Sequence, residues 1–87
     1  MGKILCKKYN MELDAIVHPP LPGPKGEELQ QNFSQKAWND WIQLQTMLIN
    51  EKRLDLSQKD SRKWLNDQMM LFLENGDYEK PSGYVPQ

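Results

Sequence analysis

Apolar side chains recur at helical spacing in the middle of the chain. The positions run at i, i+3, i+4, i+7, i+10 and i+11 through Trp38, Trp41, Ile42, Gln45, Leu48 and Ile49. This spacing places them on one face of a helix. It predicts a helix over residues 35–52 with Ser34 as its N-cap. We expect both tryptophans to lie in the core, because aromatic side chains at helical spacing bury large apolar areas.

The first 17 residues show a different pattern, in which short apolar runs lie beside lysines and are separated near Asn10. The pattern predicts two strands, over residues 3–9 and 11–17, that form an antiparallel hairpin. A hairpin alone is marginally stable in water, so we expect it to pack against helices. Residues 18–26 hold four prolines and two glycines, a composition typical of a loop.

Two further helices are predicted after this loop. The first covers residues 25–31 and has two glutamates in its first turn, where the helix dipole favours acidic side chains. The second begins near the capping pattern Ser57-x-x-Asp60 and ends near residue 74, where Asn75-Gly76 is a stop signal. The predicted buried face of this second helix contains Leu65, Met69 and Phe72.

Together these elements predict an α+β fold, in which an N-terminal two-stranded antiparallel β-hairpin packs on a small bundle of about three α-helices. We expect one domain over residues 1–87, because a chain of this length rarely forms more. Its predicted parts are a hairpin (1–17), a Pro/Gly loop (18–26), helices (27–74) and a tail (75–87).

Charge and composition narrow the classes of function. Eleven basic and twelve acidic residues give a net charge of −1, without the basic excess that nucleic-acid binding requires. The sequence holds no polybasic run for a membrane surface, no apolar run near the roughly 20 residues that span a bilayer, and no signal peptide. One cysteine cannot form an internal disulfide, which favours the reducing cytoplasm. We expect a monomer that binds neither nucleic acid nor membrane.

The tryptophan pair leads into the heptad Gln-Thr-Met-Leu-Ile-Asn-Glu at residues 45–51. Shorter motifs accompany it, namely Cys6, Lys8-Tyr9, Glu12-Leu13, Pro19-Pro20, Lys25-Gly26-Glu27, Asp77-Tyr78 and Gly83-Tyr84-Val85-Pro86. In this combination the chain resembles the bacterial Fe(II)-trafficking protein family. The resemblance implies that the chain mediates Fe(2+) transfer to iron-sulfur cluster biosynthesis or repair and protects against oxidative damage. It also implies iron-sulfur cluster assembly or repair proteins as partners.

Cys6 is the single soft ligand and the single nucleophilic thiol of the chain. A thiolate suits iron, and the neighbouring lysines favour the thiolate form. The alternative is a small buried strand residue, because free cysteine is among the most buried residue types. The resemblance adds weight to the first interpretation, since the family has a cysteine at this place.

Carboxylates near the loop are the candidate oxygen ligands. Glu12 and Asp14 are predicted to complete a metal site with Cys6, and Glu27 and Glu28 lie on the other side of the loop. Such a site would bind Fe(2+) weakly and transiently, because few strong ligands are available. We expect His18, the single imidazole, to be an exposed loop residue, since no second ligand stands at a metal-binding spacing from it.

Polar residues on the long predicted helix have two interpretations. Gln45, Thr46, Asn50 and Glu51 either fix the helix against the N-terminal strands through hydrogen bonds to backbone groups or present a surface to a partner. The sequence contains no catalytic triad, phosphate loop or paired carboxylates in a defined frame, so we do not expect an enzyme. The alternative to an iron carrier is therefore a metal-free adaptor that docks on, or shields, an iron-sulfur cluster assembly or repair partner.

Overall fold

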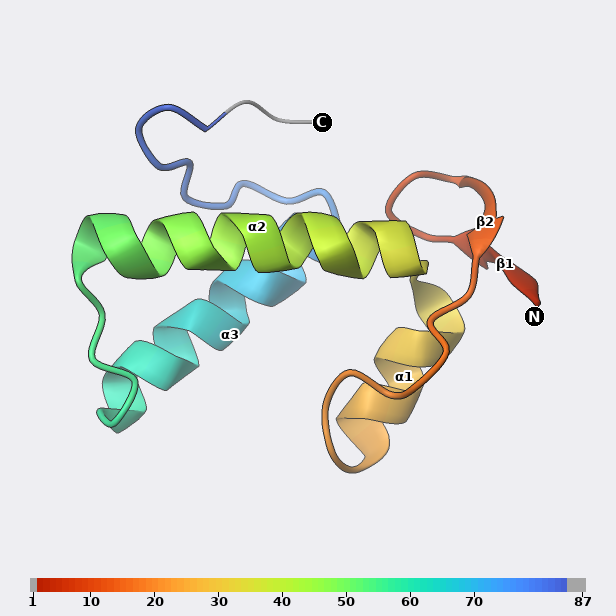
Figure 1. Ribbon diagram of the computed structural model, residues 1–87, viewed down its shortest axis with the longest axis horizontal. Helices are drawn as coiled ribbons and strands as arrows, with labels where there is room; N and C mark the ends of the chain where they lie inside the picture. Colours follow the sequence, from red (N-terminus) through yellow and green to blue (C-terminus); the bar gives the residue numbers. More distant parts are fainter. Residues whose placement is uncertain (1, 85–87) are drawn as a thin grey trace. The chain divides into compact units, whose positions relative to one another are not determined.

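The computed structural model describes residues 2–84, in which a two-stranded antiparallel sheet precedes three helices (Figure 1). This confirms the predicted α+β class. The chain divides into two compact units, residues 1–39 and 40–87, and the prediction of a single domain stays a prediction. The end of the predicted tail, residues 85–87, lies outside the described residues. The elements in chain order are β1 (Lys3–Cys6), β2 (Met11–Asp14), α1 (Pro24–Asn32), α2 (Gln35–Lys52) and α3 (Lys59–Leu73).

The hairpin strands are shorter than predicted, because residues 7–10 form a turn instead of extending β1. Asn10 has a positive φ of 54° and donates its N–H to the carbonyl of Cys6 at 2.7 Å. Asparagine tolerates this left-handed conformation better than most residues. At Lys7 the backbone N–H turns toward α1 and donates to the carbonyl of Asn32 at 2.9 Å. The turn therefore connects the sheet to the end of α1.

The proline loop leads into α1, which begins at Pro24. Gly23 is the N-cap and has a φ of 79°, a conformation that glycine adopts without steric cost. Proline at the first helical position is favoured, since the N–H it lacks has no partner within a helix. Farther along α1, the amide of Gln30 donates to the carbonyls of Ile16 at 2.9 Å and Val17 at 3.2 Å. These bonds hold the start of the loop against the helix.

Helix α2 begins in the first unit and continues in the second. Ser34 is its N-cap as predicted, because its hydroxyl oxygen accepts the N–H of Ala37 at 3.1 Å. The observed buried face of α2 is rotated about the helix axis relative to the predicted one. Ile42 is 39% exposed, whereas Trp41 is buried and Trp38 is half-buried. The buried positions of α2 follow the spacing i, i+4, i+7, i+11 and are Ala37, Trp41, Leu44 and Leu48.

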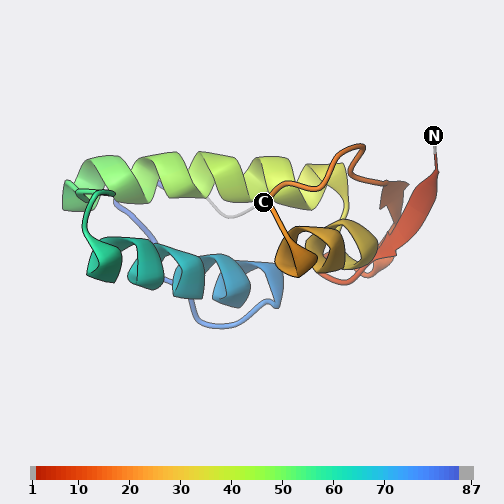
Figure 2. The same cartoon turned by 90° about the horizontal axis from the view of Figure 1, so that it is seen from below.

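In the second unit, α3 lies beside residues 40–52 of α2 (Figures 1 and 2). The predicted buried residues of α3, Leu65, Met69 and Phe72, are buried. The predicted cap at Ser57 is wrong, since α3 begins at Lys59 and its N-cap, Gln58, makes no side-chain cap bond. Ser57 instead donates its N–H and its hydroxyl to the carboxylate of Asp55, which forms a turn before the helix.

The predicted stop signal at the end of α3 is confirmed. Asn75 has a φ of 62°, and Gly76 donates its N–H to the carbonyl of Leu71 at 2.7 Å. The tail then continues along the second unit, where the ring of Tyr78 contacts Phe72 with centroids 5.0 Å apart. Within residues 2–84, no helix has both the length and the apolar composition that crossing a membrane requires.

Candidate functional site

The Cys6 thiol lies at the end of β1 and is 0% exposed. Its Sγ accepts the backbone N–H of Ser34 at 3.3 Å. The hydroxyl of Ser34 and the backbone N–H groups of Lys8 and Tyr9 also donate to the sulfur. The turn after β1 and the start of α2 therefore enclose the sulfur in a shell of donors.

This shell controls the protonation of the thiol. Burial is the largest single influence on the pKa of Cys6 and raises it, because a buried charge is poorly solvated. The hydrogen bonds from Ser34, Tyr9 and Lys8 favour the thiolate, and together they outweigh burial, so that the pKa of Cys6 is lower than usual. The site thus stabilises a thiolate that solvent does not reach.

We expect the pH dependence of stability to reveal this thiolate when the protein is compared with Cys6→Ser, whose hydroxyl does not titrate. Below the folded-state pKa both states carry the thiol proton. Between the lowered folded-state pKa and the unfolded value of about 8.5, only the unfolded state keeps it, so stability rises with pH in that window. The measurement is urea unfolding of both proteins under reducing conditions across a pH series. A stability difference that stays flat or falls with rising pH would contradict the lowered pKa.

The structure does not bring the predicted carboxylate ligands to Cys6. In the sheet, Cys6 pairs with Met11 and Lys3 pairs with Asp14. Directly opposed residues of an antiparallel pair share a face, and successive residues alternate between faces. Cys6 therefore lies on one face of the hairpin, and Glu12 and Asp14 lie on the other.

On that other face, Asp14 is exposed and its carboxylate pairs with the ammonium of Lys3 at 2.9 Å. The hydrogen bond from Lys3, followed by its charge, lowers the pKa of Asp14. Glu12 is exposed two residues away on the same strand face. The hairpin thus presents two carboxylates and one ammonium to solvent, separately from the thiol.

The remaining candidate ligands are also dispersed. His18 is exposed in the loop, as predicted. The carboxylate of Glu28 lies 3.9 Å from the ammonium of Lys25, and Glu27 is exposed in the first turn of α1. Across residues 2–84, no group of three or more His, Cys, Asp and Glu side chains has an arrangement that could hold a metal ion.

Two of the four polar residues of α2 form hydrogen bonds, and neither bond is to the N-terminal strands. Thr46 donates its hydroxyl to the carbonyl of Ile42 at 3.0 Å, and Glu51 accepts the backbone N–H of Ser82 at 2.5 Å. Gln45 is half-buried and Asn50 is exposed. Glu51 therefore contributes to the fold by holding the tail, whereas Asn50 faces solvent.

Two hollows lie where α2 meets the tail, and three of these four polar residues line them. Thr46 lines a hollow of about 500 Å³, whose other residues are Ile42, Gln43, Met47, Gly83 and Tyr84. Asn50 and Glu51 line a second hollow of about 370 Å³ with Met47, Pro81 and Ser82. Three of the four predicted partner-surface residues thus line a concave, mixed apolar and polar region of the second unit, and Gln45 lines neither hollow.

Comparison with known proteins decides the family. The family described as bacterial Fe(2+) trafficking matches residues 1–87. This chain belongs to that family. A probable Fe(2+)-trafficking protein of Hahella chejuensis is 49% identical over 84 residues, which cover 97% of this chain and 94% of that protein. Proteins of the same description from Chromohalobacter salexigens (52% identical) and Pseudomonas aeruginosa (48% identical) each align over 83 residues, 95% of this chain and 92% of theirs.

Membership of the Fe(2+)-trafficking family raises the question of which residues here suit Fe(2+). Ferrous sites that proteins hold permanently often use three protein ligands, such as two histidines and a carboxylate. Glu12 and Asp14 supply two hard oxygen donors on one exposed face, and the thiol of Cys6 is on the opposite face. The hairpin of this family member thus carries two hard oxygen donors on one face and a single thiol on the other.

Sequence patterns missed Gln68, a residue that positions the tail in this family member. Gln68 is a buried polar residue of α3, and its side-chain oxygen accepts the N–H of Glu79 at 2.6 Å. Glu51 similarly accepts the N–H of Ser82. The single available signal was a glutamine on the apolar face of α3, since a buried amide requires a hydrogen-bond partner.

Proposed function

We propose that this chain mediates Fe(2+) transfer to iron-sulfur cluster biosynthesis or repair in the cytoplasm, and that it protects against oxidative damage. Family membership over residues 1–87 is the observation that carries the proposal. The role is one of binding and delivery rather than catalysis. Iron-sulfur cluster assembly or repair proteins are the proposed partners.

In this proposal Fe(2+) is the cargo and is bound weakly and transiently. Glu12 and Asp14 contact it from the exposed face of the hairpin, and water or a partner supplies its remaining ligands. Asp14 is already paired with Lys3, so the ion must compete with an ammonium for the carboxylate. This competition favours rapid release. Cys6 is buried and enclosed by its donors, so in this proposal it belongs to the fold and is not a ligand of the ion.

Anaerobic titration with Fe(2+), followed by amide signals in NMR spectra, tests direct carriage. We expect paramagnetic broadening centred on Glu12 and Asp14 at millimolar iron, and its loss in Asp14→Asn. Asp67→Asn is the matched control, because Asp67 is also exposed and pairs with a lysine, Lys63, at 3.3 Å. Broadening that is unchanged in Asp14→Asn, or centred outside the hairpin, would contradict carriage by this face.

A second candidate, the metal-free adaptor, is favoured by the concave region of the second unit. Thr46, Asn50 and Glu51 line its hollows, and Ile42 exposes apolar area beside them. Apolar area with a few polar groups in a concave region is typical of a binding site. In this form the chain docks on an assembly or repair partner and shields its cluster without carrying iron.

Binding to a purified iron-sulfur cluster scaffold protein, with chelator or with Fe(2+), separates the two candidates. If the chain binds the scaffold protein in the presence of chelator, and Asn50→Lys abolishes this binding, the result supports the adaptor. Capture that requires Fe(2+) and is lost in Asp14→Asn supports the carrier. Asn66→Lys is the matched control, since Asn66 is exposed on α3 and lines neither hollow.

A further inference from the structure

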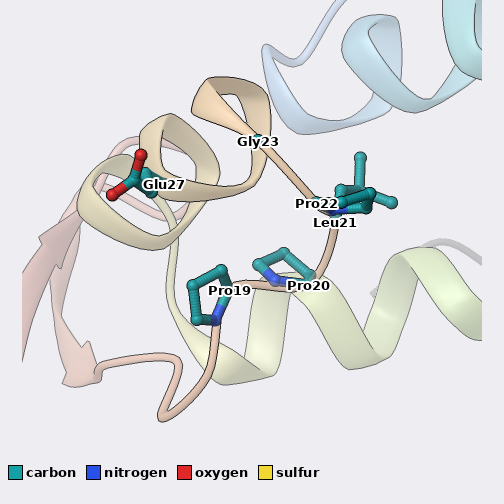
Figure 3. A pocket seen from close by; sticks show the side chains of 6 residues that line it. All are labelled: Pro19, Pro20, Leu21, Pro22, Gly23 and Glu27. Carbon is teal, nitrogen blue, oxygen red and sulfur yellow. The ribbon is translucent and has the colours of Figure 1, made fainter.

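A hollow of about 480 Å³ lies between the proline loop and the first turn of α1, and neither candidate function uses it (Figure 3). We call it the proline hollow. The loop supplies most of its lining and α1 supplies Glu27, as Figure 3 shows. The lining residues are Pro19, Pro20, Leu21, Pro22, Gly23 and Glu27.

The loop around this hollow is held in place at several points. Gln30 binds the carbonyls of Ile16 and Val17 at its start. Near its end, the backbone of Leu21 packs so closely on Gly26 that a Cβ at residue 26 would lie 1.7 Å from the carbonyl oxygen of Leu21. The prolines further restrict the backbone. A ligand therefore meets a wall that is already ordered, which lowers the entropic cost of binding.

The lining combines apolar faces with one acidic group. Three proline rings and Leu21 are the apolar part, and the carboxylate of Glu27 is the single charged group. The neighbouring carboxylate of Glu28 differs, because it pairs with Lys25 and does not line the hollow. No basic side chain in residues 2–84 forms an ion pair with Glu27. The hollow thus combines apolar rings with one negative charge, which lies on the opposite side from Leu21 and Pro22 (Figure 3).

The helix terminus at this hollow is unsuited to an anion. Anions bind helix N-termini through free backbone N–H groups. Here Pro24 has no N–H, and the N–H groups of Gly26 and Glu27 both donate to the carbonyl of Gly23, at 3.1 and 3.4 Å. Of the N–H groups that a helix N-terminus usually leaves free, that of Gly26 is already used and that of residue 24 is missing. The charge of Glu27 therefore determines the preference of the hollow.

We propose that the proline hollow binds an arginine side chain presented by a partner protein. A guanidinium is planar and weakly hydrated, so it stacks on flat surfaces while it forms hydrogen bonds with a carboxylate. The methylene groups of arginine also cover apolar area beside the charge. The proline rings, Leu21 and the carboxylate of Glu27 match these three properties. This interaction needs no iron and involves neither Asp14 nor Asn50, so its failure leaves both candidate functions untouched.

Titration with N-acetyl-arginine amide tests the assignment, with the backbone amide signals of Leu21, Gly23 and Gly26 as the readout. We expect these signals to shift at millimolar concentrations of the probe. The neutral isostere N-acetyl-citrulline amide should bind about fivefold more weakly, which is the upper end for an exposed ion pair. Glu27→Gln should weaken binding of the arginine probe by a similar factor.

Glu28→Gln is the matched control, because it removes the adjacent charge of the same helix without changing the lining of the hollow. It should bind the arginine probe as the parent protein does. The proposal would be overturned if the arginine and citrulline probes bound equally well, or if these amide signals did not shift. It would also be overturned if both glutamine variants lost the same affinity for the arginine probe. An Nα-acetyl-lysine amide probe that binds as tightly as the arginine probe would overturn the guanidinium assignment.

Discussion

Replacing Gly26 by alanine is expected to destabilise the first unit by about 2–4 kcal/mol, as overpacking against a constrained backbone does. This is the opposite of the usual effect, because replacing glycine by alanine within a helix ordinarily stabilises the protein by up to about 1 kcal/mol. The added Cβ would lie 1.7 Å from the carbonyl oxygen and 2.7 Å from the carbonyl carbon of Leu21. Both atoms belong to the backbone, so the loop itself must move.

Urea unfolding followed by far-UV circular dichroism measures this cost. Gly2→Ala is the matched control, because a Cβ at Gly2 meets nothing within 4 Å, and it should unfold almost as the parent protein does. If Gly26→Ala were as stable as the parent protein, the loop would retreat from α1 at little cost. That result would also remove the argument that the proline hollow is preformed.

The local patterns of the sequence predict the types of the elements well. The bounds of α2 and the cap at Ser34 were predictable because helical periodicity and capping depend on neighbouring residues. The strand lengths were not, since the turn after β1 holds four residues and the sequence indicated a turn at Asn10 alone. That turn forms because its amides donate to Cys6 and because Lys7 donates to Asn32, and both interactions depend on the tertiary structure.

The candidate metal site likewise depends on the tertiary structure, which local sequence patterns do not predict. Cys6, Glu12 and Asp14 are close in sequence, and their joint use as ligands requires that they share one face of the hairpin. The pairing register decides this, and a shift of one residue exchanges the two faces. The register that pairs Cys6 with Met11 separates the thiol from the carboxylates. Because the turn length sets the register, strand patterns alone could not predict the separation.

Long-range hydrogen bonds were the least predictable feature. The tail has no periodicity, yet Gln68 and Glu51 hold it through backbone N–H groups 11 and 31 residues away in sequence. Such bonds satisfy polar groups wherever the fold brings them together, and no spacing rule identifies them in advance. The hollows beside α2 exist because the tail is held there, so this candidate binding region became visible only with the structure.

Replacing Trp41 by alanine is expected to be the most damaging change in the second unit, at about 3–5 kcal/mol. Trp41 is 1% exposed, and its ring contacts Phe72 of α3 with centroids 6.1 Å apart. A chain of this size is commonly stable by only about 5–10 kcal/mol, so the variant should unfold at a much lower urea concentration. Trp41→Phe retains an aromatic ring at the position and should recover part of the loss.

The matched control for this change is Trp38→Ala, which alters the same residue type one helical turn earlier. Trp38 is half-buried, so we expect a cost of only about 1–2 kcal/mol. Comparing the two unfolding midpoints decides which face of α2 is the buried one. A larger loss at Trp38 would support the face predicted from the apolar spacing of the sequence. A larger loss at Trp41 would support the rotated face, which leaves Ile42 exposed to line the hollow beside the tail.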